Sequence, residues 1–144
     1  MNLKNKKIGV LGLGEENTAL VKFLVKQGAK VVVCDQKQKG ELSEYYERIK
    51  DLPIQFRLGP HYLDYLNDFE IVFRTPGLPY FDKKIQKAQF AGVEISSETK
   101  LFFDLCPCPI IGVTGTKGKG TTSALIWEIL KHNLKTQNSK LIYI

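Results

Sequence analysis

The sequence lacks any hydrophobic run long enough to cross a membrane. A membrane-spanning helix needs about 20 consecutive apolar residues, and no apolar stretch of this 144-residue chain approaches that length. The amino-terminal stretch MNLKNKKIGVLGLG also lacks the apolar segment and cleavage site of a signal peptide, because the glycines of a loop follow at once. These absences predict a cytoplasmic protein with no membrane partner.

Cysteine is also scarce in this sequence. The chain has three cysteines, an odd number, and two of them, Cys106 and Cys108, lie in the stretch CPCP. No second cysteine pair or histidine cluster completes a zinc site around them. The sequence therefore predicts buried or linker thiols instead of a metal site.

The positive charge of the chain is not concentrated in one place. The formal net charge is +6, which would suit nucleic acid, a membrane surface or an anionic small molecule. The lysines are scattered, and neither an RNA-binding aromatic signature nor a zinc finger is present, so we expect no nucleic-acid partner. With 43% hydrophobic and 25% charged residues, the composition is that of a globular domain, and the length falls short of two full α/β domains.

Short apolar runs alternate with helical patterns along the chain. The continuous β-branched run Val31–Val33 is typical of a strand covered on both faces, and Gly28 predicts the end of the helix before it. The stretch HYLDYL, residues 61–66, is assigned to a helix in the same alternation. This rhythm predicts an α/β fold with a Rossmann-like parallel sheet flanked by helices.

A proline-rich connector divides the chain near residue 108. The stretch DLCPCP follows a helical pattern, and then a strand is expected at residues 110–114, followed by a glycine-lysine loop and a helix. The stretch LIYI, residues 141–144, resembles the next strand. We expect a first domain at residues 1–108, and at residues 109–144 the truncated start of a P-loop ATP-binding domain.

The first glycine-rich loop, LGLGEEN, follows the first strand. A helix that begins just after Gly12 and Gly14 offers free amides and a positive dipole end to an anion. Asp35 ends the second strand about 20 residues later, where an acidic side chain commonly meets a ribose or base. An NAD site is one interpretation, although Asn17 stands where the dinucleotide fingerprint has its third glycine, and Glu15 and Glu16 lie where a pyrophosphate would bind. The other interpretation is a tight turn with Asp35 at a solvated strand end.

The second glycine-rich loop, TGTKGKGTT at residues 114–122, is typical of a triphosphate site. Its glycines let backbone amides curl around phosphate oxygens, and Lys119 adds a compact positive charge. The pattern is G-x-x-G-K, and Gly120 stands where the usual motif has a hydroxyl residue, so Thr121 or Thr122 would reach the magnesium ion. A purely structural turn is the alternative.

Several of these features occur together and in order in one known family. They are GLG after the first strand, VCDQK, FRTPGLP, AGVEISSETKLFF and the TGTKGKGTT loop. The sequence resembles the Mur ligases over its whole length, and most closely those that join D-glutamate to UDP-N-acetylmuramoyl-L-alanine. The resemblance implies a first domain that binds the UDP end of the substrate and a second that binds ATP and Mg²⁺.

The resemblance also implies roles for individual residues. The substrate would lie against Gly12, Gly14, Glu15, Glu16, Asp35, Gln36, Lys37, Thr75, Pro76 and Gly77, although Thr75 to Gly77 also fit a simple proline turn. The ATP phosphates would lie against Gly115, Thr116, Lys117, Gly118, Lys119, Gly120 and Thr121, with Lys119 catalytic and Thr121 at the metal.

The implied reaction activates the substrate carboxylate as an acyl phosphate, which the amine of D-glutamate attacks to form an amide. The family's other metal ligands and its third domain would lie beyond residue 144, so we expect the chain to be the front of a longer ligase that binds the UDP substrate without turnover. A folylpolyglutamate synthetase is a rival, since its loop also has GKG, and a non-catalytic NAD-binding regulatory module is another. The apolar helix after the second loop and an open sheet edge favour dimerisation.

Overall fold

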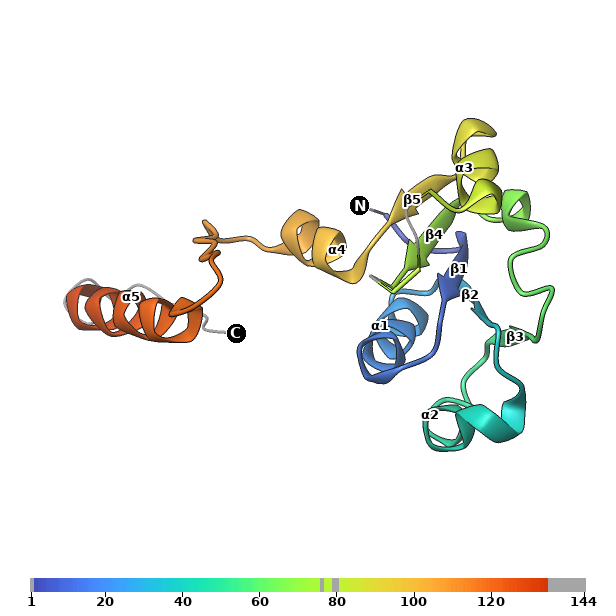
Figure 1. Cartoon of the computed structure of the whole chain (residues 1–144), viewed down its shortest axis with the longest axis horizontal. Helices are drawn as coiled ribbons and strands as arrows, with labels where there is room; N and C mark the ends of the chain where they lie inside the picture. Colours follow the sequence, from blue (N-terminus) through green and yellow to red (C-terminus); the bar gives the residue numbers. More distant parts are fainter. Residues whose placement is uncertain (1, 76, 79–80, 135–144) are drawn as a thin grey trace. The chain divides into compact units, whose positions relative to one another are not determined.

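The computed structural model describes residues 2–75, 77–78 and 81–134. It divides the chain into two compact units, Met1–Cys106 and Pro107–Ile144. The first unit contains one parallel sheet with the strand order β3-β2-β1-β4-β5 (Figure 1). The strands are β1 (Lys7–Leu11), β2 (Lys30–Asp35), β3 (Gln55–Leu58), β4 (Ile71–Arg74) and β5 (Glu94–Ser96). The predicted Rossmann-like sheet is confirmed.

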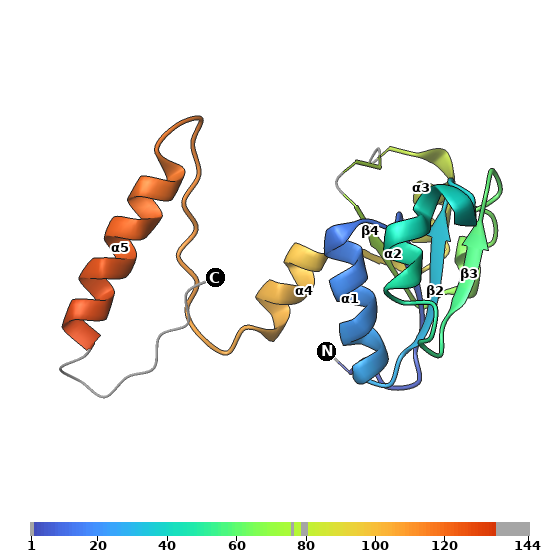
Figure 2. The ribbon, with the colours of Figure 1, turned by 90° about the horizontal axis from the view of Figure 1, so that it is seen from below.

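Helices cover both faces of this sheet. They are α1 (Glu15–Lys26), α2 (Ser43–Glu47), α3 (Lys83–Phe90) and α4 (Glu98–Leu105), with the 3₁₀ helices η1 (Lys39–Leu42) and η2 (Leu66–Asp68). Apolar side chains of α1, η1 and α4 pack on one face, and those of η2 and α3 pack on the other. The ribbons of α1 and α3 lie on opposite sides of the sheet (Figure 1). On the first face α4 lies beside α1 (Figure 2).

The sequence pattern of the central strands explains the two layers. Val31 and Val33 point into the core on the α1 face, whereas Val32 between them points into the core on the α3 face. Successive side chains of a strand alternate between faces, so a run of β-branched residues is what a strand buried on both faces requires. Gly9 of β1 is needed for close packing, because a Cβ there would lie 2.9 Å from Cδ2 of Phe69.

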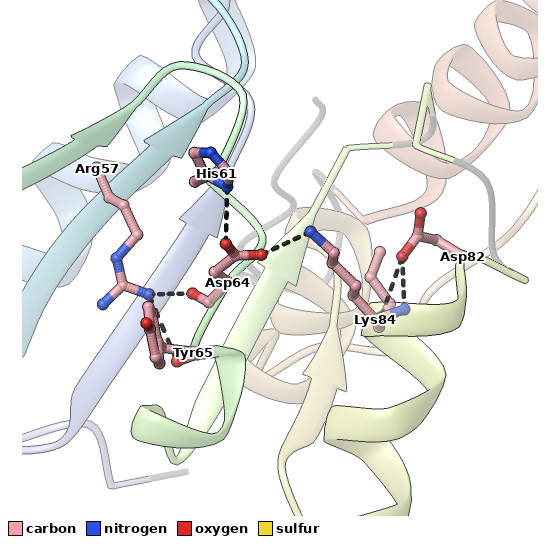
Figure 3. Close-up of polar contacts among 7 residues, drawn as sticks. Arg57, His61, Asp64, Tyr65, Asp82 and Lys84 are labelled. Carbon is pink, nitrogen blue, oxygen red and sulfur yellow. Dashed lines mark hydrogen bonds and ion pairs between the residues drawn. The ribbon is translucent and has the colours of Figure 1, made fainter.

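Residues 61–66 were expected to be helical, but residues 61–65 form turns and Leu66 begins the 3₁₀ helix η2, so no α-helix forms here. Arg57 of β3 explains this difference, since its Nη1 donates to the carbonyl of Asp64 at 2.6 Å and to that of Tyr65 at 3.4 Å (Figure 3). These bonds hold Tyr65 in the left-handed region, with φ 63°, which is incompatible with a continuing α-helix. The helix prediction for this segment was therefore wrong.

The turns at residues 61–65 lie in the connection from β3 to β4, and they form hydrogen bonds to the start of α3. The Asp64 carboxylate accepts from Nζ of Lys84 at 2.6 Å and lies 3.0 Å from Nδ1 of His61 (Figure 3). Asp82, the N-cap of α3, accepts from the amides of Lys84 and Ile85 at 2.8 and 3.3 Å. The hydrogen bond from Lys84 holds the pKa of Asp64 below its usual value. These hydrogen bonds hold residues 61–65 in place, where a helix between β3 and β4 was expected.

The second unit contains α5 (Lys119–Leu134). The helix predicted after the glycine-lysine loop is present, whereas the strand expected at residues 110–114 has no regular secondary structure. A strand needs a neighbour that accepts its ladder hydrogen bonds, and none lies among residues 107–134. The strand expected at residues 141–144 lies outside the described residues. Within the described ranges, no helix combines the length and apolar character needed to cross a membrane.

Candidate functional site

Three loops meet at the carboxyl ends of β1, β2 and β4. The amide of Gly12 donates to the carbonyl of Cys34 at 2.7 Å, which joins the loop after β1 to the end of β2. On the other side, Gly12 has φ +82°, and a Cβ there would lie 3.2 Å from Cγ2 of Thr75, just after β4. The chain crosses from β1 to β2 in one direction and from β4 to β5 in the other, and open α/β sheets bind ligands at such a switch point.

Asp35 holds two of these loops together. Its carboxylate accepts from the amide of Leu13 at 2.6 Å and from the amide of Lys37 at 2.8 Å. The residue is only 8% exposed, and the bond from Leu13 is buried, where it is strengthened, whereas the bond from Lys37 is partly buried. The side chain expected to contact a ligand is therefore engaged with backbone, and the exposed groups beside it are Gln36 and Lys37.

Asn17 fixes the other end of the first loop, a role that the sequence did not suggest. Its Nδ2 donates to the carbonyl of Gly12 at 2.6 Å and to that of Leu11 at 3.1 Å, and the residue is 4% exposed. A glycine at this position, as in the dinucleotide fingerprint, has no group that could do this. The departure from the fingerprint thus has a structural reason, which is to satisfy two carbonyls where β1 ends.

The loop after β1 ends at the amino end of α1, where no side chain caps the first backbone amides. Gly14 is the N-cap of α1 and has no side chain to accept from the first turn. The first backbone bond of the helix runs from the amide of Thr18 to the carbonyl of Gly14 at 2.9 Å. The amides of Glu15, Glu16 and Asn17 precede that bond, and free donors at the positive end of a helix dipole suit an anion.

The side chains around this helix end are mostly acidic. Burial raises the pKa of Glu98, at the start of α4, and the nearby Glu16 raises it further. Glu15 is paired instead, since both of its carboxylate oxygens accept from the guanidinium of Arg48, at 2.6 and 2.8 Å. This hydrogen bonding holds the pKa of Glu15 below its usual value. No spacing rule would have found Arg48, because it lies 33 residues from Glu15.

The loop after β4 supplies the remaining expected contacts. Thr75 is half-buried beside Gly12, and Gly77 is exposed, with no atom within 4 Å of the position of a Cβ. Nη1 of Arg74 donates to the carbonyl of Leu78 at 2.8 Å and closes the turn. Pro76, also expected at the site, lies outside the described residues.

The loop of the second unit has a different arrangement. Nζ of Lys119 donates to the carbonyl of Gly115 at 2.7 Å, so the lysine closes its own loop. Gly115 and Gly118 have positive φ, at 151° and 76°. The expected neighbours Thr116, Lys117, Gly120 and Thr121 are all exposed. Among the side chains that the structure describes, no group of three or more His, Cys, Asp or Glu is placed to hold a metal ion.

Comparison of the sequence with known families shows which family the chain belongs to. The model of the Mur ligase MurD-like N-terminal domain matches residues 6–97, which include all five strands. The chain belongs to this family. The UDP-N-acetylmuramoylalanine–D-glutamate ligases of Acetivibrio thermocellus and Ruminiclostridium cellulolyticum are 43% and 39% identical to it over 129 residues, which is 90% of the chain. The chain spans 28% of the length of each of these relatives.

Solved structures of two ligases share the fold. The UDP-N-acetylmuramate-alanine ligase MurC of Thermotoga maritima matches 90% of this chain, and the match covers 30% of the length of MurC. The TM-score is 0.54 and the identity is 27%. A pseudomurein peptide ligase type C of Methanothermus fervidus matches 89% of this chain over 26% of its own, with a TM-score of 0.57 and 28% identity. The family resemblance inferred from the motifs is confirmed.

Proposed function

We propose that the carboxyl edge of β1, β2 and β4 binds the UDP portion of UDP-N-acetylmuramoyl-L-alanine. The observation that carries this proposal is the convergence of the three loops around Gly12, with a helix end whose amides no side chain caps. The ligases of Acetivibrio thermocellus and Ruminiclostridium cellulolyticum, which are similar to the chain, are named for this substrate. Their name also motivates the proposed wider role as part of a ligase that adds D-glutamate in peptidoglycan synthesis, in the cytoplasm.

In the proposed complex the backbone makes most of the contacts. The amides of Glu15 and Glu16 receive the diphosphate, because they lie at the start of α1 before the first helical bond. The segment 35–37 and Gly77 flank the uracil. Asp35 acts by holding the amides of Leu13 and Lys37 in place, so that the base is recognised by a rigid edge.

The proposed reaction of the ligase belongs to the ATP-dependent amide-forming class. Bound ATP would transfer its terminal phosphoryl group to the substrate carboxylate, giving an acyl phosphate and ADP, and Mg²⁺ would offset the charge of the phosphates. The amine nitrogen of D-glutamate would then form a bond to the acyl carbon and lose a proton, and inorganic phosphate would leave. In this chain the proposed triphosphate loop runs from Gly115 to Thr121. The Lys119 ammonium would turn from the Gly115 carbonyl to the phosphates, and the Thr121 hydroxyl would lie near the metal, since phosphoryl transfer depends on positioning and charge.

Calorimetric titration of the chain with UDP, uridine and NADH tests the proposal. We expect UDP to bind, uridine to bind more weakly, and NADH not to bind, because Asn17 occupies the place of the third fingerprint glycine. Binding of NADH without any binding of UDP would instead indicate a dinucleotide-binding regulatory module.

A further inference from the structure

The pair of Arg48 and Glu15 joins two helices at the edge of the proposed site. Arg48 follows α2 directly, and Glu15 is the first residue of α1. The two N–H groups of the guanidinium meet the two carboxylate oxygens at 2.6 and 2.8 Å, which is the bidentate geometry. The arginine is therefore held with its fork directed at the amino end of α1.

Stability alone is a weak reason for this pair. The side chain of Glu15 is 69% exposed and that of Arg48 is 36% exposed. Exposed ion pairs contribute little to folding, because water screens the charges and both long side chains lose conformational freedom. The planar fork of arginine, however, fits a phosphate as well as it fits a carboxylate.

The amino end of α1 carries acidic side chains, so a diphosphate that binds there needs a cation beside it. Glu15 and Glu16 lie in the first turn of α1, and Glu98 is close enough to Glu16 for the two carboxylates to interact. A diphosphate on the amides of this turn would meet these carboxylates and be repelled. Arg48 is the cationic side chain that the described structure bonds to the first residue of the turn.

We propose that Arg48 exchanges partners when the nucleotide binds, releasing the Glu15 carboxylate and donating to the diphosphate. In the free protein the carboxylate of Glu15 stands in for a phosphate and keeps the guanidinium in position. This exchange rests on the proposed function, since it requires the diphosphate to lie at the start of α1. It makes Arg48 a binding residue and Glu15 its competitor.

The exchange predicts opposite effects from the two partners of one ion pair. Arg48→Gln removes a cation from the diphosphate, and because charge-assisted hydrogen bonds are the strong ones, we expect UDP to bind about tenfold more weakly or worse. Glu15→Gln removes the competitor and a repelling charge, so UDP should bind several-fold more tightly. Uridine has no diphosphate, and its affinity should not change in either variant.

Two matched variants control for charge. Lys50→Gln and Glu47→Gln make the same changes of net charge, and their side chains pair with each other, 2.5 Å apart. All five proteins are titrated by calorimetry with UDP and with uridine, and their thermal unfolding is recorded. Since both test variants break the same pair, their melting temperatures should move alike while their UDP affinities move apart.

Three results would overturn the exchange. The first is a change of UDP affinity in the same direction for Arg48→Gln and Glu15→Gln, which would mean that the pair only supports the fold. The second is an effect no larger than that of Lys50→Gln or Glu47→Gln. The third is an equal effect on uridine and UDP, which would overturn the exchange while leaving the proposed function standing. If the unmodified chain binds neither ligand, the proposed function fails first and the exchange fails with it.

Discussion

Replacing Asn17 tests whether the loop after β1 is built as the structure indicates. Asn17→Ala removes both hydrogen bonds from Nδ2 and leaves the carbonyls of Leu11 and Gly12 without this donor. A buried polar group that loses its partner costs about 1–3 kcal/mol. The Leu11 bond is buried and the Gly12 bond partly so, and together we expect a loss of about 2–4 kcal/mol in the free energy of unfolding.

Urea denaturation followed by circular dichroism measures this loss. With a urea dependence of about 2 kcal/mol per molar, in the middle of the usual range, the midpoint should fall by roughly 1–2 M. Hydrogen exchange of the β1 amides assigns the transition to the first unit. Asn17→Asp has nearly the same shape but no N–H to donate, so it should lose at least as much as Asn17→Ala.

Asn67→Ala provides the control, because Asn67 is exposed in η2. Surface substitutions of this kind usually change stability by no more than about 0.5 kcal/mol. If Asn17→Ala lowered the free energy of unfolding no more than Asn67→Ala does, the loop would not depend on Asn17. The structural reason given for Asn17 in place of the third fingerprint glycine would then be refuted. We also expect Asn17→Gly, which restores the dinucleotide fingerprint, to be destabilised without binding NADH.

Three further predictions concern other groups in the two loops and the crossover. Asp35→Asn keeps the shape of the side chain but loses a charged acceptor, so the free energy of unfolding should fall by about 1.5–3 kcal/mol; unchanged stability with lost uridine binding would mean that Asp35 contacts the base directly. The folded-state pKa values of Glu15 and Asp64 are lowered from 4.5 and 3.8, so the stability they contribute is present above those values and is lost as the pH falls through the lower folded values. Asp64→Asn should flatten the acid limb of a plot of unfolding free energy against pH, and Glu15→Gln should flatten it only slightly because its ion pair is exposed; an unchanged limb in Asp64→Asn would contradict this. Lys119→Met should weaken ATP binding about tenfold and leave UDP binding unchanged, because its ammonium group would face the triphosphate; equal ATP affinity would contradict the role of the second loop.

The parts of the fold with strong periodicity could be predicted from sequence. The run Val31–Val33 indicated a strand covered on both faces, and Gly28 ends the first helical pattern with φ +77°. Residues 61–66 could not be assigned correctly, because a distant arginine, Arg57, determines their backbone. The strand at residues 110–114 has the right composition, but pairing depends on a neighbour that composition does not supply.

The sequence indicated where the loops after β1, β2 and β4 would lie, but not the contacts that their side chains make. The order of glycine loops and Asp35 indicated the carboxyl edge of the sheet, where the loops do meet. The direction of the Asp35 carboxylate toward two backbone amides depends on the register of β1 and β2. Asn17 was noted only as a departure from a fingerprint. Arg48 follows α2, whose Tyr45 and Tyr46 pack against the core, and it bonds to Glu15, which is distant in the sequence.

The most direct test of the account is an amide chemical-shift titration of the ¹⁵N-labelled chain with UDP. The account predicts that the largest changes fall on the amides of Gly14 to Glu16, on those of Gln36 and Lys37, and on that of Gly77, with residues 115–121 unaffected. Changes centred on residues 115–121, or no saturable change at the edge of the first sheet, would contradict it.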